Sequence, residues 1–379
     1  MSRARSLTPA IPATLLMPGR TLSGQGLARS ICELCSEYGL RGVLVHGRSL
    51  EKSGMLSDIV NRAPKSLTVT TWQHPGGEPN LTHVEDCLAE LRDRRPDWVA
   101  AIGGGSVMDL TKAAAGLLEA PLPVEAYHDG ASIPPSPTPF CAVPTTAGTG
   151  SEATTVSVLT NTRTNTKKSI RHTSFMPHLV VLDPAVLEHC PATVLAHSGM
   201  DALTQAIESF ISTHAVAVTE DWSLLAVRRI GPALVPAFRG ARGSMTEDLM
   251  AGSYLAGLAL ANARLGLVHG LAHPLGVRYG MPHGLACAVT LPSVLAFNRA
   301  SCETKYERLS TALGGDAITV VKGLLRELNI TSPLSGQSLY DKAEIIKETL
   351  ASGSTAANPR KANEDDIGSL LDSLFRSSG

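Results

Sequence analysis

Residues 99–109 have the sequence VAAIGGGSVMD, in which an apolar run leads directly into three glycines. Such a run is typical of a buried strand, and the pattern after the glycines is helical and continues through Lys112. The backbone amides of Gly103, Gly104 and Gly105 can approach a pyrophosphate closely, and the helix N-terminus adds partial positive charge there. The turn lacks the GxGxxG spacing of the dinucleotide fingerprint, so it also fits a strand-to-helix turn without a ligand.

The sequence around this turn alternates between strand-like and helix-like stretches. Strand-like sequences lie at 41–47, 66–72, 97–105, 139–146 and 178–184, and helical patterns lie at 82–95 and 107–119. This alternation predicts a parallel sheet with crossover helices. After Pro184 the strand-like runs stop, and long helical patterns follow at 199–213, 217–238, 245–263 and 315–328. The sequence therefore predicts an α/β domain over residues 1–187 and an all-α domain over residues 188–379.

Composition and charge narrow the class of protein. The 379 residues are 43% hydrophobic and carry a formal net charge of −1, which gives no electrostatic bias toward nucleic acid or anionic membranes. No segment approaches the roughly 20 apolar residues that span a bilayer, and the first residues lack the apolar run of a signal peptide. The seven cysteines are scattered, which predicts reduced thiols, and Cys32 and Cys35 lie in an amphipathic helical pattern. We expect a cytoplasmic enzyme with no nucleic-acid or membrane partner.

A second polar loop follows the strand-like run at 139–146. It has the sequence PTTAGTGSE, residues 144–152, and is dense in hydroxyl groups and glycine. A flexible surface loop with a helix cap would have the same composition. However, two such loops at successive strand ends favour one shared crevice, because ligands of open α/β sheets bind beyond the carboxyl ends of the strands.

The helical half contains a group of acidic, amide and imidazole side chains. In GMDALTQAIESF, Asp201 and Gln205 share one helix face, with Glu208 nearby. Three histidines lie in apolar segments further on: His269, His273 and His283. Each histidine alone also fits a hydrogen-bonded structural role. Together, one carboxylate and two or three imidazoles suit an iron or zinc ion with an open coordination position, and burying them is costly unless they are paired or coordinated.

In combination, these segments resemble a known family. GGGSVMDLTKAAA, PTTAGTGSE, the segment from Lys167 to LDP, GMDALTQAIESF, GLVHGLAHPLG, MPHG and Asn358-Pro359-Arg360 follow the order found in iron-containing (group III) alcohol dehydrogenases. The resemblance runs from about Gly19 to the C-terminus and extends in fold to glycerol dehydrogenase and dehydroquinate synthase. It implies an N-terminal Rossmann-like dinucleotide-binding domain, an all-helical C-terminal domain and an active site in the cleft between them.

The resemblance also implies residue roles. The pyrophosphate would be held by Gly103, Gly104, Gly105 and Ser106, with Asp109 in the same cofactor-binding segment. Further cofactor contacts would come from Thr145, Thr146 and Thr149, which line the cleft, and from Lys167 at the ribose. His273 would lie near the nicotinamide.

The family's metal ligands are an aspartate and three histidines, and these positions fall on Asp201, Gln205, His269 and His283. Gln205 departs from the pattern, because an amide oxygen is neutral and binds iron or zinc more weakly than an imidazole does. Two outcomes follow: a weakened Fe²⁺ or Zn²⁺ site held by the other three residues, or a metal-free enzyme that polarises its substrate by hydrogen bonds. Maleylacetate reductases resemble the family and work without a catalytic ion, although their motifs differ from GMDALTQ and HGLAHPLG.

The residues after the first predicted strand bear on the choice between NADH and NADPH. Many family members have an acidic residue there, which accepts hydrogen bonds from a ribose 2'-hydroxyl. This chain has Gly47, Arg48 and Ser49 instead, and a guanidinium can accommodate a 2'-phosphate. We therefore expect NADPH to be preferred over NADH, unless Arg48 simply points into solvent.

The expected reaction is reversible hydride transfer between nicotinamide C4 and the carbonyl carbon of an aldehyde, ketone or oxo acid. Asp201 would act within the metal site and His273 as a proton relay. A basic cluster could select acidic aldehydes or could be solvated surface: Arg163, Lys167, Lys168, Arg171, His172 and Arg264. A lyase like dehydroquinate synthase and a nucleotide-binding protein without catalysis are the alternatives from other classes. A homodimer is expected.

Overall fold

The structure is a computed structural model that describes residues 9–164 and 166–376. These residues form two compact units. One unit comprises Leu16–Leu195 and Gly240–Tyr254, and the other comprises the described residues up to Leu15, Ala196–Arg239 and the described residues from Leu255 onward. The contiguous division at residue 187 that the sequence suggests remains a prediction about independently folding domains.

The first unit is built on a six-stranded parallel sheet. Its strand order is β1-β8-β5-β4-β2-β3. The strands are β1 (Arg20–Ser23), β2 (Arg41–His46), β3 (Thr68–Gln73), β4 (Trp98–Gly103), β5 (Phe140–Pro144) and β8 (Leu179–Leu182). Five of these strands coincide with the predicted strand-like runs, and β1 is the addition. Every residue of β4 and β5 is buried, as expected for central parallel strands that are covered on both faces.

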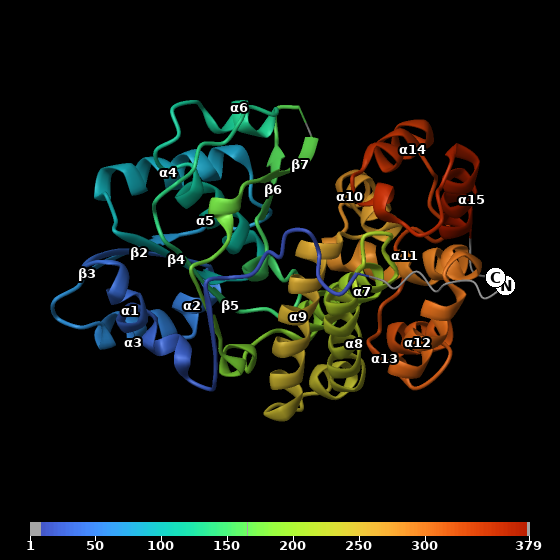
Figure 1. The fold of residues 1–379 in the computed structure, drawn as a ribbon, viewed down its shortest axis with the longest axis horizontal. Helices are drawn as coiled ribbons and strands as arrows, with labels where there is room; N and C mark the ends of the chain where they lie inside the picture. The colour runs from blue at the N-terminus through green and yellow to red at the C-terminus, as the bar shows by residue number, and fades with distance from the viewer. Residues whose placement is uncertain (1–8, 165, 377–379) are drawn as a thin grey trace. The chain divides into compact units, whose positions relative to one another are not determined.

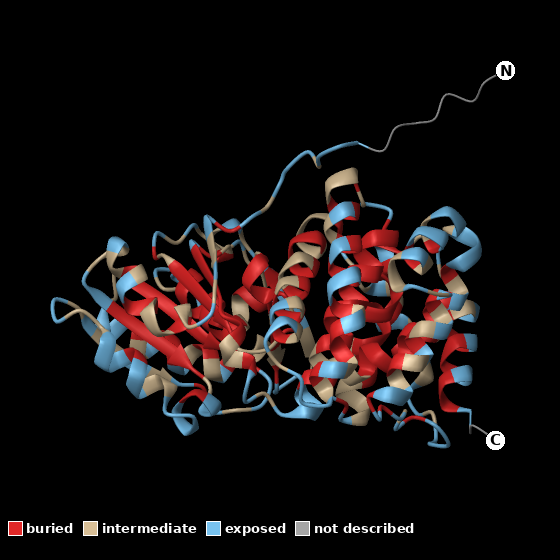
Figure 2. Cartoon of the chain, turned by 90° about the horizontal axis from the view of Figure 1, so that it is seen from below, coloured by how far each residue is buried: buried red, intermediate tan, exposed pale blue. Residues whose placement is uncertain are grey.

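Helices cover both faces of this sheet (Figure 1). Helices α1 (Ile31–Cys35), α2 (Arg48–Lys52) and α3 (Met55–Arg62) lie on one face, and α4 (Leu81–Arg94), α5 (Gly105–Gly116) and α6 (Val124–His128) lie on the other. Ala100 and Ile102 of β4 point into the core under α1, where Cys32 and Cys35 are also buried. The buried residues follow the strands, as Figure 2 shows in red. Burial among apolar side chains gives these two cysteines a packing role.

A two-stranded antiparallel hairpin lies between β5 and β8 in the sequence. It consists of β6 (Val156–Asn161) and β7 (Thr166–Arg171), with Asn161 paired to Thr166 at its tip. This hairpin is absent from the predicted strands, because β7 has the sequence TKKSIR and buries only Ile170. Pairing along the ladder, rather than an apolar pattern, makes this segment a strand.

The second unit is helical, and nine α-helices follow β8 among the described residues. They are α7 (Ala192–Ile211), α8 (Ala217–Phe238), α9 (Ser244–Ala263), α10 (Leu267–Tyr279), α11 (His283–Asn298), α12 (Glu303–Leu313), α13 (Ala317–Glu327), α14 (Lys342–Ala351) and α15 (Glu364–Phe375). The first residues of α7 and the N-terminal half of α9 belong to the sheet unit. A parallel α/β half followed by a helical half confirms the predicted fold class.

Within residues 9–164 and 166–376, no single helix is long and apolar enough to cross a bilayer. The bent pair Ser244–Ala263 and Leu267–Tyr279 meets the length and composition criteria only when its two helices are taken together.

Candidate active site

The glycine-rich turns lie at the point where the strand order of the sheet reverses. From β2 the chain moves outward to β3 and then returns to β4 on the other side of β2. In open α/β sheets, ligands bind beyond the carboxyl ends of the strands at such a switch point. Residues 47–49 directly follow β2, and residues 103–106 end β4 and begin α5. The structure therefore brings these two predicted cofactor-binding segments to one edge of the sheet.

The loop after β5 packs against the turn after β4. The amide of Thr145 donates to the carbonyl oxygen of Gly103 at 2.9 Å. A Cβ atom built on Gly105 would lie 2.5 Å from Cγ2 of Thr149, so any other residue here would have to displace Thr149. The N-cap residue of α5 is Gly104, which has no side chain to accept from the amides of the first turn. This arrangement suits an anion at the N-terminus of α5.

A buried amine ties the same loop to α5. Lys112 on α5 is fully buried, and its Nζ donates to oxygens of Ser151, Thr154 and Val156 at 2.6–3.0 Å. Burial lowers the pKa of Lys112 to about 8. Through these four hydrogen bonds the buried amine anchors residues 151–156 to α5, and it is not a surface charge.

Asp109, one turn before Lys112, completes this anchor. Its carboxylate accepts from the Ser151 hydroxyl at 2.5 Å and from the amide of Val158 at 2.9 Å. Burial raises the pKa of Asp109, while the Lys112 ammonium opposes the shift. One carboxylate oxygen of Asp109 thus accepts a hydrogen bond from the loop and the other accepts one from β6. Asp109 therefore holds in place the loop that contains Thr145, Thr146 and Thr149.

Glu152, beside this anchor, should make the stability of the protein depend on pH. Burial raises its pKa from 4.5 to about 7, so between these values the folded protein binds more protons than the unfolded chain. Stability therefore falls as pH rises through this window.

Urea unfolding of the wild type and of Glu152→Gln between pH 4.5 and pH 7 measures this effect. Over this range we expect the free energy of unfolding of the wild type to fall by on the order of 3 kcal/mol more than that of the variant. Glu119→Gln, at an exposed site, should keep the wild-type slope. Equal slopes for Glu152→Gln and wild type would contradict this assignment.

The basic residues of the hairpin have local acidic or polar partners. Lys167 pairs with Glu78, Arg163 pairs with Glu125, and Lys168 lies 3.4 Å from Asp129. Arg171 donates to Ser169 at 3.1 Å, and His172 contacts Ser174 at 2.7 Å. Arg264 belongs to the other unit. Arg163 and Lys168, whose side chains are more than half exposed, are typical of a solvated charged surface, whereas the side chain of Lys167 is only 13% exposed.

Arg48 begins α2 at the end of β2. Its guanidinium donates to the carbonyl oxygen of Pro75, which lies just beyond β3. The charge is therefore held over the ends of two neighbouring strands, at the edge of the sheet where a ribose would be recognised.

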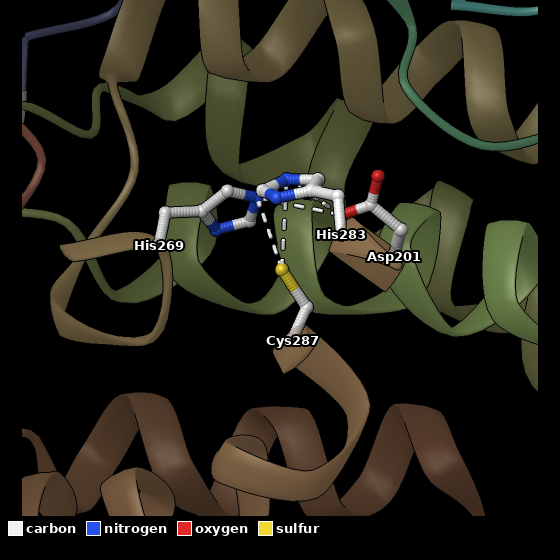
Figure 3. A group of neighbouring side chains, drawn as sticks. All are labelled: Asp201, His269, His283 and Cys287. Carbon is white, nitrogen blue, oxygen red and sulfur yellow. Dashed lines mark hydrogen bonds and ion pairs between the residues drawn. The ribbon is translucent and has the colours of Figure 1, made fainter. Parts of the chain in front are cut away.

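Four potential metal ligands come together in the helical unit (Figure 3). Asp201 comes from α7, His269 from α10, and His283 and Cys287 from α11. One ligand atom from each lies within 4.8 Å of all the others. Nε2 of His269 and Nε2 of His283 lie 3.4 and 3.8 Å from Oδ1 of Asp201. Three of the four predicted ligand positions are thus brought together.

Glu208 supports this cluster from behind. Its Oε2 accepts from Nδ1 of His269 at 2.6 Å, and its Oε1 accepts from the amide of Val268 at 2.6 Å. Although burial opposes it, the acidic neighbours Cys287, Asp201 and Glu208 raise the pKa of His269. A carboxylate on Nδ1 fixes the ring so that Nε2 faces the cluster. Glu208 lies two helical turns after Asp201, a spacing that could have indicated this role from the sequence.

Two further predicted residues, Gln205 and His273, each lie one helical turn after a member of this cluster. Gln205 is one turn after Asp201 on α7 and is 3% exposed, and its Oε1 accepts no hydrogen bond from any described residue. His273 is one turn after His269 on α10, and its ring centroid lies 5.3 Å from that of His283. Cys287 is not among the predicted ligands, although it lies one helical turn after His283.

The donor set fits a divalent ion. Oδ1 of Asp201 is buried and accepts no hydrogen bond from the described residues. Its nearest donors, Nε2 of His269 and of His283, are 3.4 and 3.8 Å away, and coordination of an ion would satisfy this buried oxygen. Carboxylate, imidazole and thiolate are the ligands that zinc and iron use in proteins. The residues present therefore fit the ion that the sequence resemblance implies.

Comparisons with known proteins cover both units. Residues 18–184 match the family "Iron-containing alcohol dehydrogenase", and residues 195–375 match "Fe-containing alcohol dehydrogenase family, C-terminal". The 1,3-propanediol dehydrogenase of Klebsiella pneumoniae is 35% identical, over 95% of this chain and 98% of its own. The NADPH-dependent butanol dehydrogenase of Clostridium saccharobutylicum is 28% identical, over 91% and 94%.

Solved structures agree with these matches. A 1,3-propanediol oxidoreductase has a TM-score of 0.91 at 32% identity, over 96% of this chain and 99% of its own. The sulfoacetaldehyde reductase from Bifidobacterium kashiwanohense in complex with NAD+ has a TM-score of 0.89 at 26% identity, over 96% and 98%.

Proposed function

The chain belongs to the iron-containing alcohol dehydrogenase family, and we propose that it reduces small aldehydes reversibly with NADPH, using a divalent ion held in the helical unit. The family membership makes it an oxidoreductase that acts on CH–OH groups and uses a nicotinamide cofactor. The substrate size, the preference for NADPH and the ion are our proposals. A cytoplasmic location and a homodimer are expected from the sequence and stay predictions.

The observation that carries the proposal is the cluster of Asp201, His269 and His283. These residues would hold the ion, with Gln205 beside them on α7. A bound divalent ion supplies Lewis-acid polarisation of a carbonyl oxygen and lowers the pKa of an alcohol in the reverse direction. His273 is the proposed proton relay, because it lies one turn from His269 and its ring is close to that of His283.

The cofactor would bind at the switch point of the sheet. Gly103, Gly104, Gly105 and Ser106 would hold the pyrophosphate through backbone amides. Gly47 and Ser49 would flank the adenosine ribose, and Lys167 would reach it from the hairpin. Thr145, Thr146 and Thr149 would contact the cofactor directly, whereas Asp109 would act by positioning their loop.

The test of the function is NADPH oxidation with a panel of small aldehydes, before and after dialysis against a chelator. We expect turnover, its loss on chelation and its recovery with Zn²⁺ or Fe²⁺. Turnover that survives chelation would support the metal-independent type of enzyme that maleylacetate reductases represent. Binding without turnover would support a catalytically inactive protein, and product formation without net NADPH oxidation would support a lyase.

Arg48 provides a test of the cofactor preference. Arg48→Ala should lower kcat/KM for NADPH by about 10- to 100-fold, the value of one charge-assisted hydrogen bond to a phosphate. The efficiency with NADH should hardly change. Lys52→Ala, at the end of the same helix, is the charge-matched control and should leave both values unchanged. A wild type that prefers NADH would refute the proposal.

The substrate class follows from the partners of the basic cluster. Three of the six residues of the basic cluster, Arg163, Lys167 and Lys168, each pair with an acidic residue, which reduces the positive charge that could select an anionic aldehyde. We therefore propose neutral aldehydes over acidic ones. Kinetics on a matched pair of neutral and carboxylated aldehydes tests this directly, and a higher efficiency with the acid would overturn it.

A further inference from the structure

The sulfur of Cys287 lies within coordination range of the predicted metal ligands (Figure 3). Its Sγ is 3.8 Å from Nε2 of His269 and 3.7 Å from Nε2 of His283. Zinc–ligand bonds of about 2.0–2.3 Å at tetrahedral angles place ligand atoms roughly 3.3–3.6 Å apart. The distances from Asp201 to the two imidazoles are 3.4 and 3.8 Å. Three of these four distances are slightly longer than the tetrahedral spacing, and all four ligand atoms lie within 4.8 Å of one another, so small side-chain movements would complete a tetrahedral donor set.

Position and charge both favour Cys287 over Gln205 as the remaining ligand. Cys287 lies one turn after His283, so α11 presents both side chains on one face. Its thiol is buried between the two imidazoles. As a thiolate it would add a negative charge within the ligand set itself, beside Asp201. The amide oxygen of Gln205 is neutral and would add none.

We propose that the Cys287 thiolate is the fourth protein ligand of this site, in place of the Gln205 amide, and that the site therefore selects zinc or cobalt(II) over iron(II). When the ion binds, the Sγ–H proton passes to solvent and the sulfur–metal bond forms, with no change of oxidation state. The inference rests on the proposed function only in assuming that an ion is bound. Thiolate ligands favour zinc among the divalent ions that proteins use, which gives the selectivity.

Four protein ligands remain compatible with a catalytic site. Catalytic zinc can expand to five ligands in the transition state, so a substrate oxygen can be added to the set. Gln205, with its unpartnered Oε1, would then stay near the site as a hydrogen-bond acceptor rather than as a ligand.

The first experiment needs no substitution. X-ray absorption at the zinc edge of the zinc-loaded wild type should show one sulfur at about 2.3 Å together with nitrogen and oxygen ligands at about 2.0–2.1 Å. A shell of nitrogen and oxygen alone overturns the proposal.

The second experiment replaces zinc by cobalt(II) and follows the thiolate-to-cobalt charge-transfer band in the near ultraviolet. We expect the band in the wild type, its loss in Cys287→Ser, and a loss of metal affinity of at least about 100-fold in that variant. Cys302→Ser, in the same unit, and Gln205→Ala should both keep the band. Absence of the band in the wild type, or its retention in Cys287→Ser, would show that Cys287 is not a ligand and would overturn the proposal.

These readouts separate this inference from the proposed function. A sulfur ligand and a charge-transfer band in a protein that does not oxidise NADPH with any aldehyde would support Cys287 as a ligand and refute the function. Turnover in a metal-loaded enzyme without a sulfur ligand would support the function and refute the inference.

Discussion

His269→Ala is expected to lower kcat for aldehyde reduction by about a thousandfold and to release most of the bound ion. Loss of the ion removes a Lewis acid worth several kcal/mol of transition-state stabilisation, of which about 4 kcal/mol corresponds to a factor of a thousand. His269 is buried and contacts Asp201, Glu208 and Cys287, so its removal affects the ligand set and the carboxylate behind it at once. Metal analysis and kcat measured on the same preparation check the result.

Two further variants make this prediction specific. Glu208→Gln keeps all of the predicted ligands and should lower metal affinity by about 10- to 100-fold, with high activity when metal is in excess. His214→Ala, at an exposed histidine of the same unit, should retain both metal and kcat. If His269→Ala keeps its activity while it contains no metal, the ion is not part of the reaction and a metal-free mechanism takes its place.

Lys112→Met should lower the free energy of unfolding by about 3–5 kcal/mol. The substitution leaves Asp109 and Glu152 buried without their nearest positive charge, and it removes the donor from oxygens of Ser151, Thr154 and Val156. Unpaired groups of this kind carry their full desolvation cost. The measurement is denaturant unfolding at pH 7, with the midpoint and the slope compared with those of the wild type.

The matched control is a lysine on the hairpin surface. Lys168 on β7 lies 3.4 Å from Asp129 and about half of its side chain is exposed, so Lys168→Met should cost less than about 1 kcal/mol. Similar losses in the two variants would mean that the buried anchor contributes no more than a surface ion pair.

The sequence alone predicts the fold class and most strands of the sheet. Strands β2, β4, β5 and β8 are continuous apolar runs bounded by turn residues, and that pattern is local. The strands that pattern did not predict are β1 at the edge of the sheet and the hairpin β6–β7. Their sequences are polar or alternate between apolar and polar residues, so they become strands only through pairing. β1 pairs with β8, and β6 and β7 pair with each other.

The active-site residues divide in the same way. The sequence by itself determined the glycine-rich turns, Asp201 and the histidines, because short motifs and the residue types that bind phosphates and metals can be recognised locally. Only the tertiary structure decided that Asp109 and Lys112 anchor a loop, that Glu208 contacts His269, and that the sulfur of Cys287 lies beside Asp201, His269 and His283. The physical reason is distance along the chain: Asp201 and Cys287 are brought within 4.8 Å by the packing of α7 against other helices, which no local pattern records.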